Sequence, residues 1–264
     1  MNSLDKQRIA RSFSRSAGTY DAHSTLQKEL AKELVELVRS LRIRPSAILD
    51  IGTGTGEVAS LLNKLFPEAR ISGCDIAPGM VKKAIQQHPG EMFQFDIADA
   101  EALPYPDKKF DLVASSTTYQ WINDLPKAFG EARRVLADKG TFAFLTFGPK
   151  TLTELKRCYR ISVDRNANYL HDYRNSRQVH AMLKKIGFRN IKVSSRVVTR
   201  LYPDFRTFLR SLKGIGALNA SHNLPRGLMG KSKMAELIKT YEANCKMGNN
   251  VYASFEVITA VCGK

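Results

Sequence analysis

The chain has 264 residues, of which 43% are hydrophobic and 25% charged, and 41 lysines and arginines face 25 acids, for a formal net charge of +16. That length fits one large domain or two small ones, with enough chain to bury a real core. The composition excludes a long disordered chain, a collagen-like repeat and a disulfide scaffold. The basic excess fits either the surface of a protein from a basic proteome or an acidic partner such as nucleic acid, anionic lipid or an acidic protein.

The cysteines and the N-terminal segment indicate the cellular compartment in which the protein acts. No two cysteines share a CxxC spacing, so neither a zinc ribbon nor a redox pair is predicted, and their isolation fits a reducing compartment. Residues 1–15 carry charges and no apolar stretch, which predicts no signal peptide. No apolar run is long enough to span a bilayer. We therefore expect a cytoplasmic protein with no membrane partner and no metal site. The cysteines are Cys74, Cys158, Cys245 and Cys262.

In the first 150 residues, short apolar strands alternate with amphipathic helices. The first helix places leucines and a valine on one face and charged residues on the other, and a proline follows its end. This alternation predicts an α/β fold with a parallel sheet and helices on both faces. Strands are predicted at 47–51, 70–75, 92–95, 110–115 and 141–147, and helices at 22–41, 57–65, 78–87 and 125–136.

The alternation stops after residue 147. A helix is predicted over 176–186, ending at Gly187, and two long strands over 191–201 and 252–261. Between these strands, the mostly helical segment 203–246 is predicted to be an insertion over the carboxyl edge of the sheet, where such folds bind ligands. Residues 1–202 and 247–264 would then form the main domain with an N-terminal helical cap. The cations of the insertion are Arg206, Arg210, Lys213, Arg226, Lys231, Lys233, Lys239 and Lys246.

The strongest local signal is the run Asp50-Ile51-Gly52-Thr53-Gly54-Thr55-Gly56 after the first strand. Glycines at a strand-to-helix turn permit positive φ and let the backbone approach a ligand closely. Asp75 lies 19 residues after Gly56, at the end of the second strand, where nucleotide-binding folds place an acid that binds the ribose hydroxyls. A carboxylate suits this role because it accepts from both hydroxyls.

The glycine spacing favours one cofactor over another. Dinucleotide binders use GxGxxG with a pyrophosphate at the helix start, whereas this run is GxGxG and Glu57 follows it directly. A carboxylate there would repel a pyrophosphate. S-adenosylmethionine has no phosphate and carries a sulfonium and an ammonium, so nearby acids such as Asp50 suit it. The alternative is a glycine turn that merely joins strand and helix.

An acidic loop, residues 96–104, follows the third strand. An acid followed by a small residue at this edge can accept from an adenine amino group and offer a backbone N–H to the ring. Asp99 with Ala100 is our choice and Asp96 the rival. The alternative is a solvated acidic loop.

These motifs carry a resemblance. DIGTGTG, GCDIAPGM, DAEALPYPDKKFDLV, TTYQW and RRVLADKG resemble class I S-adenosylmethionine-dependent methyltransferases. FSRSAGTYDAHSTLQ, FGPKTLTEL, YPDFRTFLRSLKGIGA, LMGK and YASFEVITAV are narrower and resemble the malonyl-acyl-carrier-protein O-methyltransferases of biotin synthesis, over nearly the whole chain. Two departures stand out. Thr53 replaces a cysteine common in the family, and residues 115–119 replace an Asn-containing stretch, so the resemblance assigns no side-chain role to Ser116 or Thr117.

The resemblance implies a Rossmann-like class I methyltransferase fold: a mainly parallel seven-stranded sheet with an antiparallel edge strand, N-terminal helices and a helical lid. It implies methyl transfer from S-adenosylmethionine, leaving S-adenosylhomocysteine, to the free carboxyl of malonyl-acyl-carrier protein. The carrier is an acidic helical protein, so the basic charge would steer it. We expect no nucleic-acid partner and take the chain to act as a monomer. The expected cofactor-binding residues are Phe13, Tyr20, Asp50, Gly52, Gly54, Gly56, Asp75, Ile76, Met80, Asp99, Ala100 and Ser115.

The chemistry requires alignment rather than a base. A carboxylate, with a pKa of about 4, is already a nucleophile at neutral pH, so the protein must align the reactants and exclude water. We expect Tyr20, with Phe13, to close over the methyl donor, although Phe13 would serve equally as a core anchor. Arg210 and Lys213 would orient the malonyl carboxylate, the alternative being a solvated helix face. No direct chemical role is assigned to His23, His88, His171, His180 or His222.

Three rival functions remain open at this point. The first is a class I methyltransferase for another small acceptor, such as a quinone precursor or a free carboxylic acid. The second is an RNA or DNA methyltransferase, which the charge permits, although the chain lacks an Asn/Asp-Pro-Pro-aromatic motif and a recognisable RNA-binding module. The third is a cofactor-binding regulator without turnover.

Overall fold

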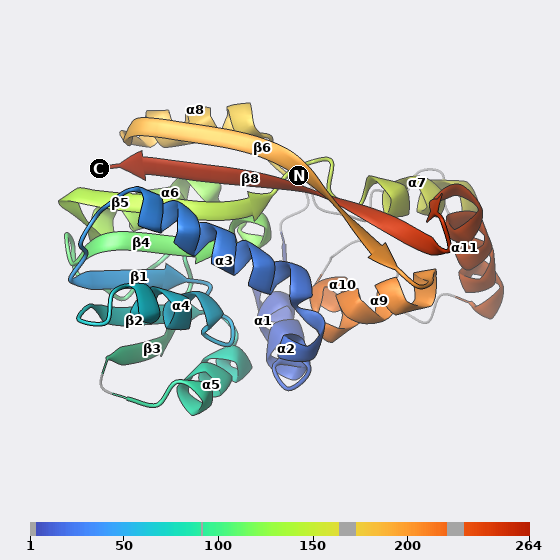
Figure 1. Cartoon of the computed structure of the whole chain (residues 1–264), viewed down its shortest axis with the longest axis horizontal. Coiled ribbons are helices and arrows are strands. Elements are labelled where there is room, and N and C mark those ends of the chain that lie inside the picture. The colour runs from blue at the N-terminus through green and yellow to red at the C-terminus, as the bar shows by residue number, and fades with distance from the viewer. Residues whose placement is uncertain (1–3, 91, 164–172, 221–229) are drawn as a thin grey trace.

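A computed structural model describes residues 4–90, 92–163, 173–220 and 230–264. His171, His222, Arg226 and part of the LMGK motif lie outside the described residues. A central sheet carries helices on both faces (Figure 1). The strands are β1 (Ala47–Ile51), β2 (Arg70–Asp75), β3 (Phe93–Ile97), β4 (Phe110–Ser116), β5 (Leu136–Phe147), β6 (Arg189–Tyr202), β7 (Lys246–Met247) and β8 (Asn250–Gly263). The helices are α1 (Lys6–Ser16), α2 (Tyr20–His23), α3 (Thr25–Ser40), α4 (Glu57–Leu65), α5 (Pro78–Gln87), the 3₁₀ turn η1 (Tyr119–Trp121), α6 (Leu125–Val135), α7 (Thr153–Ser162), α8 (Ser176–Ile186), α9 (Phe205–Gly214), α10 (Ala217–Ala220) and α11 (Lys231–Asn244).

The strand order is β3-β2-β1-β4-β5-β8-β6, with the two-residue β7 paired to β8. The first five strands of this order are parallel, and β8 runs antiparallel to both β5 and β6. The predicted α/β fold is therefore confirmed. One detail is corrected, because the reversed strand is β8, one place in from the edge strand β6. The segment between β6 and β8 turns the chain back, so β8 pairs along the whole of β6 and takes the inner position.

Alternating side chains of the strands face two hydrophobic cores. On one face, Ile48 of β1 packs in a core with α3 and α4. On the other, Leu49 packs with α6 and α8. Strand order reverses between β1 and β4, where the loops after these strands part to opposite sides. Open α/β sheets bind ligands in the crevice outside the carboxyl ends of their strands at such a point.

Strands β6 and β8 extend beyond the end of β5 as a two-stranded ribbon, in which residues 197–202 pair with residues 251–256. The helices α7, α9 and α11 gather at this ribbon (Figure 1). Phe205, Phe208 and Tyr241 are fully buried there and belong to the same core as the sheet. The described part of the insertion 203–246 therefore packs as an extension of the main core.

Several boundaries differ from the sequence-based expectation. The predicted helix 22–41 is α3, which begins at Thr25 because Ser24 leaves helical geometry (φ −93°, ψ 33°). Strand β5 begins at Leu136, because this residue is buried and pairs with Phe110 of β4. Strand β3 ends at Ile97, two residues beyond the predicted strand 92–95. Helix α7 was not predicted. Among the described residues, no helix is long and apolar enough to cross a membrane.

Candidate active site

The glycine run forms the turn from β1 to α4. Gly52, Gly54 and Gly56 all have positive φ (71°, 56° and 91°). The backbone N–H groups of Gly52 and Thr53 donate to the Cys74 carbonyl at 2.7 and 2.9 Å, which ties the turn to the end of β2. A Cβ at Gly52 would lie 2.1 Å from Oγ1 of Thr118, so only glycine fits there.

Asp75 ends β2 and is held by the backbone around it. Its Oδ2 accepts from the N–H of Gly54 at 3.0 Å and its Oδ1 from the N–H of Ala77 at 2.9 Å. Burial raises the pKa of Asp75, and the hydrogen bonds from Ala77, Gly54 and Ile76 oppose this rise. A carboxylate has more lone pairs than these backbone hydrogen bonds use, so it can still accept from a ligand hydroxyl.

These elements surround a first cavity, and the empty space in it together with the open solvent at its mouth is about 760 Å³. An added Cβ at Gly54 would meet nothing within 4 Å, so this glycine leaves open space at the cavity wall. Nine of the twelve expected cofactor-binding residues line the cavity, namely Phe13, Tyr20, Gly52, Gly54, Asp75, Ile76, Met80, Asp99 and Ala100.

The other three expected residues do not line the first cavity and support it from behind. Asp50 is 0% exposed beneath the glycine turn, and burial, partly offset by Thr53 and Ala59, raises its pKa to about 7. Ser115 is also 0% exposed and donates through Oγ to the carbonyl of Ile51 at 2.7 Å. Gly56 lies against His88, which a Cβ would approach to 2.5 Å.

The acidic loop after β3 supplies one end of the first cavity. Asp99 and Ala100 line it, whereas Asp96 points elsewhere and accepts from Tyr105 and Gln94 at 3.0 Å each. This placement favours Asp99 over its rival. The N–H of Glu101 donates to Oδ1 of Asp99 at 2.9 Å.

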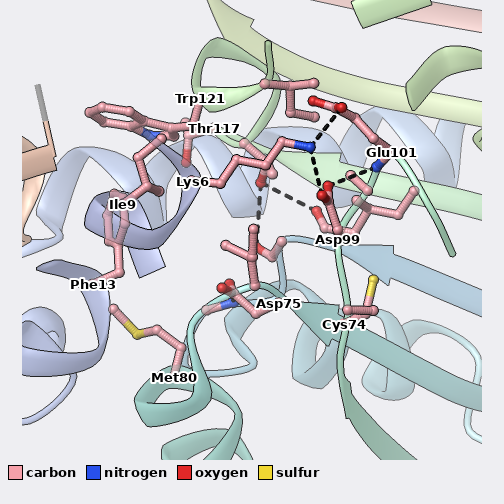
Figure 2. A pocket seen from close by; sticks show the side chains of 18 of the residues that line it. Lys6, Ile9, Phe13, Cys74, Asp75, Met80, Asp99, Glu101, Thr117 and Trp121 are labelled. Atoms are coloured by element: carbon pink, nitrogen blue, oxygen red, sulfur yellow. Dashed lines mark hydrogen bonds and ion pairs between the residues drawn. The ribbon is translucent and has the colours of Figure 1, made fainter. Parts of the chain in front are cut away.

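Lys6 of α1 reaches across the cavity to this loop (Figure 2). Its ammonium lies 2.6 Å from a carboxylate oxygen of Asp99 and 2.6 Å from one of Glu101. Burial lowers the pKa of Lys6, but the hydrogen bonds and charges of the two acids outweigh it, so the net pKa is raised. No local pattern predicted this contact, because it joins residues far apart in the sequence.

Other lining residues were also missed. Most lie at the carboxyl end of a strand or on α1, and only the sheet topology brings them together. Figure 2 shows Phe13 and Trp121 on the side of α1, away from Asp99 and Glu101. Their rings meet edge to face, with centroids 5.3 Å apart. The missed residues are Lys6, Ile9, Ile51, Cys74, Ala98, Glu101, Ser116, Thr117, Thr118, Trp121 and Ile122.

A second cavity, with an empty volume of about 680 Å³, adjoins the first. Phe13, Tyr20, Thr117 and Trp121 line both cavities and form their common wall. Burial raises the pKa of Tyr20 far above its ordinary value, so its hydroxyl stays protonated at neutral pH. The remaining wall is contributed by Gln27, Gln120, Phe147, Thr151, Leu152, Tyr173, Leu212, Ile215, Ala217, Leu218 and Phe255.

The structure does not bring Arg210 and Lys213 to either cavity. Both side chains are exposed on the outer face of α9, and Arg210 donates to Oγ1 of Thr207 at 3.0 Å. This placement agrees with the solvated helix face that was the alternative for both. Of the described histidines, His23, His88 and His180, none lines either of these two cavities. The described ranges contain no cluster of three metal-ligating side chains.

This chain is similar to known proteins in sequence and in fold. Residues 49–144 match a family model described as a methyltransferase domain. A solved structure, the YcgJ protein of Bacillus subtilis, superposes with a TM-score of 0.62 at 19% identity, covering 88% of this chain and 98% of that one. The phosphoethanolamine N-methyltransferase 2 of Haemonchus contortus, solved in complex with S-adenosyl-L-methionine, superposes with a TM-score of 0.55 at 18% identity, covering 87% of this chain and 52% of that one.

A curated relative matches nearly the whole chain. The malonyl-[acyl-carrier protein] O-methyltransferase of Geobacter sulfurreducens is 38% identical over 263 residues, covering 98% of each chain. Its counterpart in Methylococcus capsulatus is 35% identical, covering 98% of this chain and 94% of the relative. This protein therefore belongs to the malonyl-[acyl-carrier protein] O-methyltransferase family.

Proposed function

We propose that this chain binds S-adenosylmethionine in the first cavity and transfers its methyl group to the free carboxylate of a malonyl thioester on acyl carrier protein. The first cavity fits the cofactor on three counts. Asp75 offers free lone pairs to ribose hydroxyls, Asp99 and Ala100 offer an acceptor and a backbone N–H to adenine, and Gly54 leaves room beside them. The family and its relatives support the same assignment.

The observation that carries the proposal is the common wall of the two cavities. A methyl group passes directly from donor to acceptor only when both are held in line, with the reacting atoms about 3 Å apart. Phe13, Tyr20, Thr117 and Trp121 border both spaces, so a ligand in each would meet at these side chains. Apolar and aromatic groups there exclude water from the junction.

S-adenosylmethionine supplies an electrophilic methyl group on a positively charged sulfur. The carboxylate oxygen forms the new bond to the methyl carbon while the carbon–sulfur bond breaks, and the bonding electrons stay on sulfur. No proton moves, so this chain needs no general base. A negative and a positive charge vanish in this step, and an apolar surrounding therefore favours it.

The insertion supplies the surface that we propose for the acidic carrier protein. In its described part, Arg206, Arg210, Lys231 and Lys233 are all exposed, whereas the buried residues of α9 and α11 hold it to the core. Leu212, Ile215, Ala217 and Leu218 of the same segment line the second cavity, so a carrier docked on the outer face would present its acyl group nearby. Arg210 and Lys213 thus have a proposed role in docking rather than at the carboxylate.

Reversing the charge of Arg206, Arg210, Lys231 and Lys233 to glutamate is expected to raise KM for malonyl-carrier protein at least about tenfold at low salt, because steering by opposite charge is lost. The KM for a small malonyl thioester should change less than twofold. The control reverses four exposed cations at the far end of the sheet, namely Lys184, Lys185, Arg189 and Lys192. Equal losses on both substrates, or in both variants, would argue against docking on the insertion.

The function itself is tested with methyl-labelled S-adenosylmethionine and malonyl-loaded carrier protein. We expect the label on the carrier as an ester that mild base removes, and none on carrier loaded with an acetyl group. Parallel reactions with free carboxylic acids and a quinone precursor test the rival acceptors. Label on one of these and not on the carrier would overturn the proposal.

We further propose that the chain acts in the cytoplasm as a monomer. All four cysteines are free and buried, which fits a reducing compartment. Described residues of a single chain build the walls of both cavities, so a second copy is not needed to complete them.

A further inference from the structure

The second cavity carries no charge on its described walls, although its proposed ligand is an anion. Its lining is mostly aromatic and aliphatic, and the polar side chains among it are neutral. The malonyl carboxylate must therefore be held by neutral hydrogen-bond donors. These candidates are Tyr20, Gln27, Thr117, Gln120, Trp121, Thr151 and Tyr173.

Two of these donors are already engaged within the protein. Thr151 accepts from the N–H of Glu256 at 3.1 Å and donates to the carbonyl of the same residue at 3.3 Å. The amide of Gln120 accepts from Oγ1 of Thr146 at 3.0 Å and donates to the carbonyl of Thr117. Both side chains brace the cavity wall and have little capacity left for a ligand.

Gln27 is different. It lies on α3, three and four residues before Leu30 and Ala31, which are each 2% exposed, so it shares the buried face of the helix. It also lines the second cavity. Within the described part of the chain its amide makes no hydrogen bond. Gln27 is half-buried, so the part of its amide that faces the second cavity can bind a ligand there without first breaking a hydrogen bond within the protein.

Thr117 directly follows the end of β4 and lines the same cavity as Gln27. Its φ is 55°, a left-handed conformation that a β-branched residue rarely adopts. The strain is held by the N–H of Thr117, which donates to the Leu145 carbonyl at 2.8 Å, and by Gln120 on its carbonyl. Thr117 lines both cavities, so it lies at their common wall, where we expect donor and acceptor to meet. Backbone strain maintained in this way clusters at functional sites.

We propose that the amide of Gln27, together with the hydroxyl of Thr117, binds the carboxylate of the acceptor. The inference rests on the proposed function and names the groups that recognise its substrate. An amide offers two N–H donors and no charge. It can therefore orient the carboxylate without the strong pairing that would lower the nucleophilicity of the oxygen, and it leaves the cavity electrically neutral except for the reacting charges.

The test uses Gln27→Leu and Gln27→Glu with malonyl-carrier protein. In the leucine variant we expect kcat/KM to fall about 30- to 100-fold, the usual consequence of removing hydrogen bonds to a charged group, while the Kd for S-adenosylmethionine changes less than twofold. In the glutamate variant we expect a larger loss at pH 8, because two carboxylates then face each other. Its kcat/KM should recover at least about tenfold as the pH falls to 6, because a protonated glutamate is again a neutral donor. The wild type should show no such rise.

Gln86 on α5 is exposed and lines neither cavity, so Gln86→Leu and Gln86→Glu are the matched controls. Wild-type kcat/KM in Gln27→Leu would overturn the inference. So would a parallel loss of cofactor affinity, or a glutamate variant whose pH profile follows that of the wild type. A wild-type protein that leaves malonyl-carrier protein unlabelled would overturn the proposed function instead, and the two failures are thus distinct.

Discussion

Replacing Asp75 by alanine is expected to weaken S-adenosylmethionine binding at least about 100-fold. The variant loses the acceptor for the ribose hydroxyls, and hydrogen bonds to a charged group are worth about 1.5–3 kcal/mol each. Two such bonds correspond to a factor of about 100 or more. The substitution also leaves the backbone N–H groups of Gly54 and Ala77 without their acceptor, because their nitrogens lie 3.0 and 2.9 Å from the Asp75 carboxylate oxygens. Isothermal titration of the purified protein with the cofactor measures the effect.

The matched control is Asp96→Ala. Asp96 also lies at the end of a parallel strand, but it bonds Tyr105 and Gln94 and does not line the cavity. We expect its cofactor Kd to stay within about threefold of the wild type. An Asp75→Ala protein that binds S-adenosylmethionine normally would remove the basis for placing the cofactor in the first cavity. Equal weakening in both variants would instead indicate a general loss of structure.

The cofactor side of the site was predictable because its determinants are local. Gly52, Gly54 and Asp75 follow directly from strands whose apolar residues are plain in the sequence, and parallel strands place their carboxyl ends at one edge. Phe13 and Tyr20 of the N-terminal helices were expected only through the family resemblance, and Lys6 and Gln27, which also reach the site from these helices, were not identified. Only the packing of these helices decides which side chains face a cavity.

Arg210 and Lys213 had two interpretations from the sequence, an orienting role at the malonyl carboxylate and a solvated helix face, and the local pattern bears on both. Phe205, Phe208 and Leu212 form the buried face of α9. Arg206, Arg210 and Lys213 follow one another at intervals of four and three residues, which places them on the opposite face. The helical period alone therefore predicts that these cations face solvent. This period favours the solvated helix face over a countercharge for malonate, and both side chains are exposed in the structure.

Replacing Asp50 by asparagine is expected to stabilise the cofactor-free protein at pH 8. Asp50 is 0% exposed, and burial raises its pKa to about 7 from the ordinary 3.8. Between these two values the folded state binds more protons at this group than the unfolded state, so its contribution to the free energy of unfolding falls as the pH rises. The full difference corresponds to about 4 kcal/mol, which the neutral asparagine avoids.

Urea denaturation at pH 4, 6 and 8 tests this expectation. The variant and the wild type should unfold at similar urea concentrations at pH 4, where Asp50 is protonated in the folded state, and the variant should become progressively more resistant up to pH 8. Asp138→Asn is the control, and its effect on the free energy of unfolding should have the opposite sign. A hydrogen bond from Lys108 lowers the pKa of Asp138, so removing the carboxylate should slightly destabilise the protein at neutral pH. If Asp50→Asn were instead less stable than the wild type at pH 8, the buried carboxylate would have to be charged and stabilised in the folded protein.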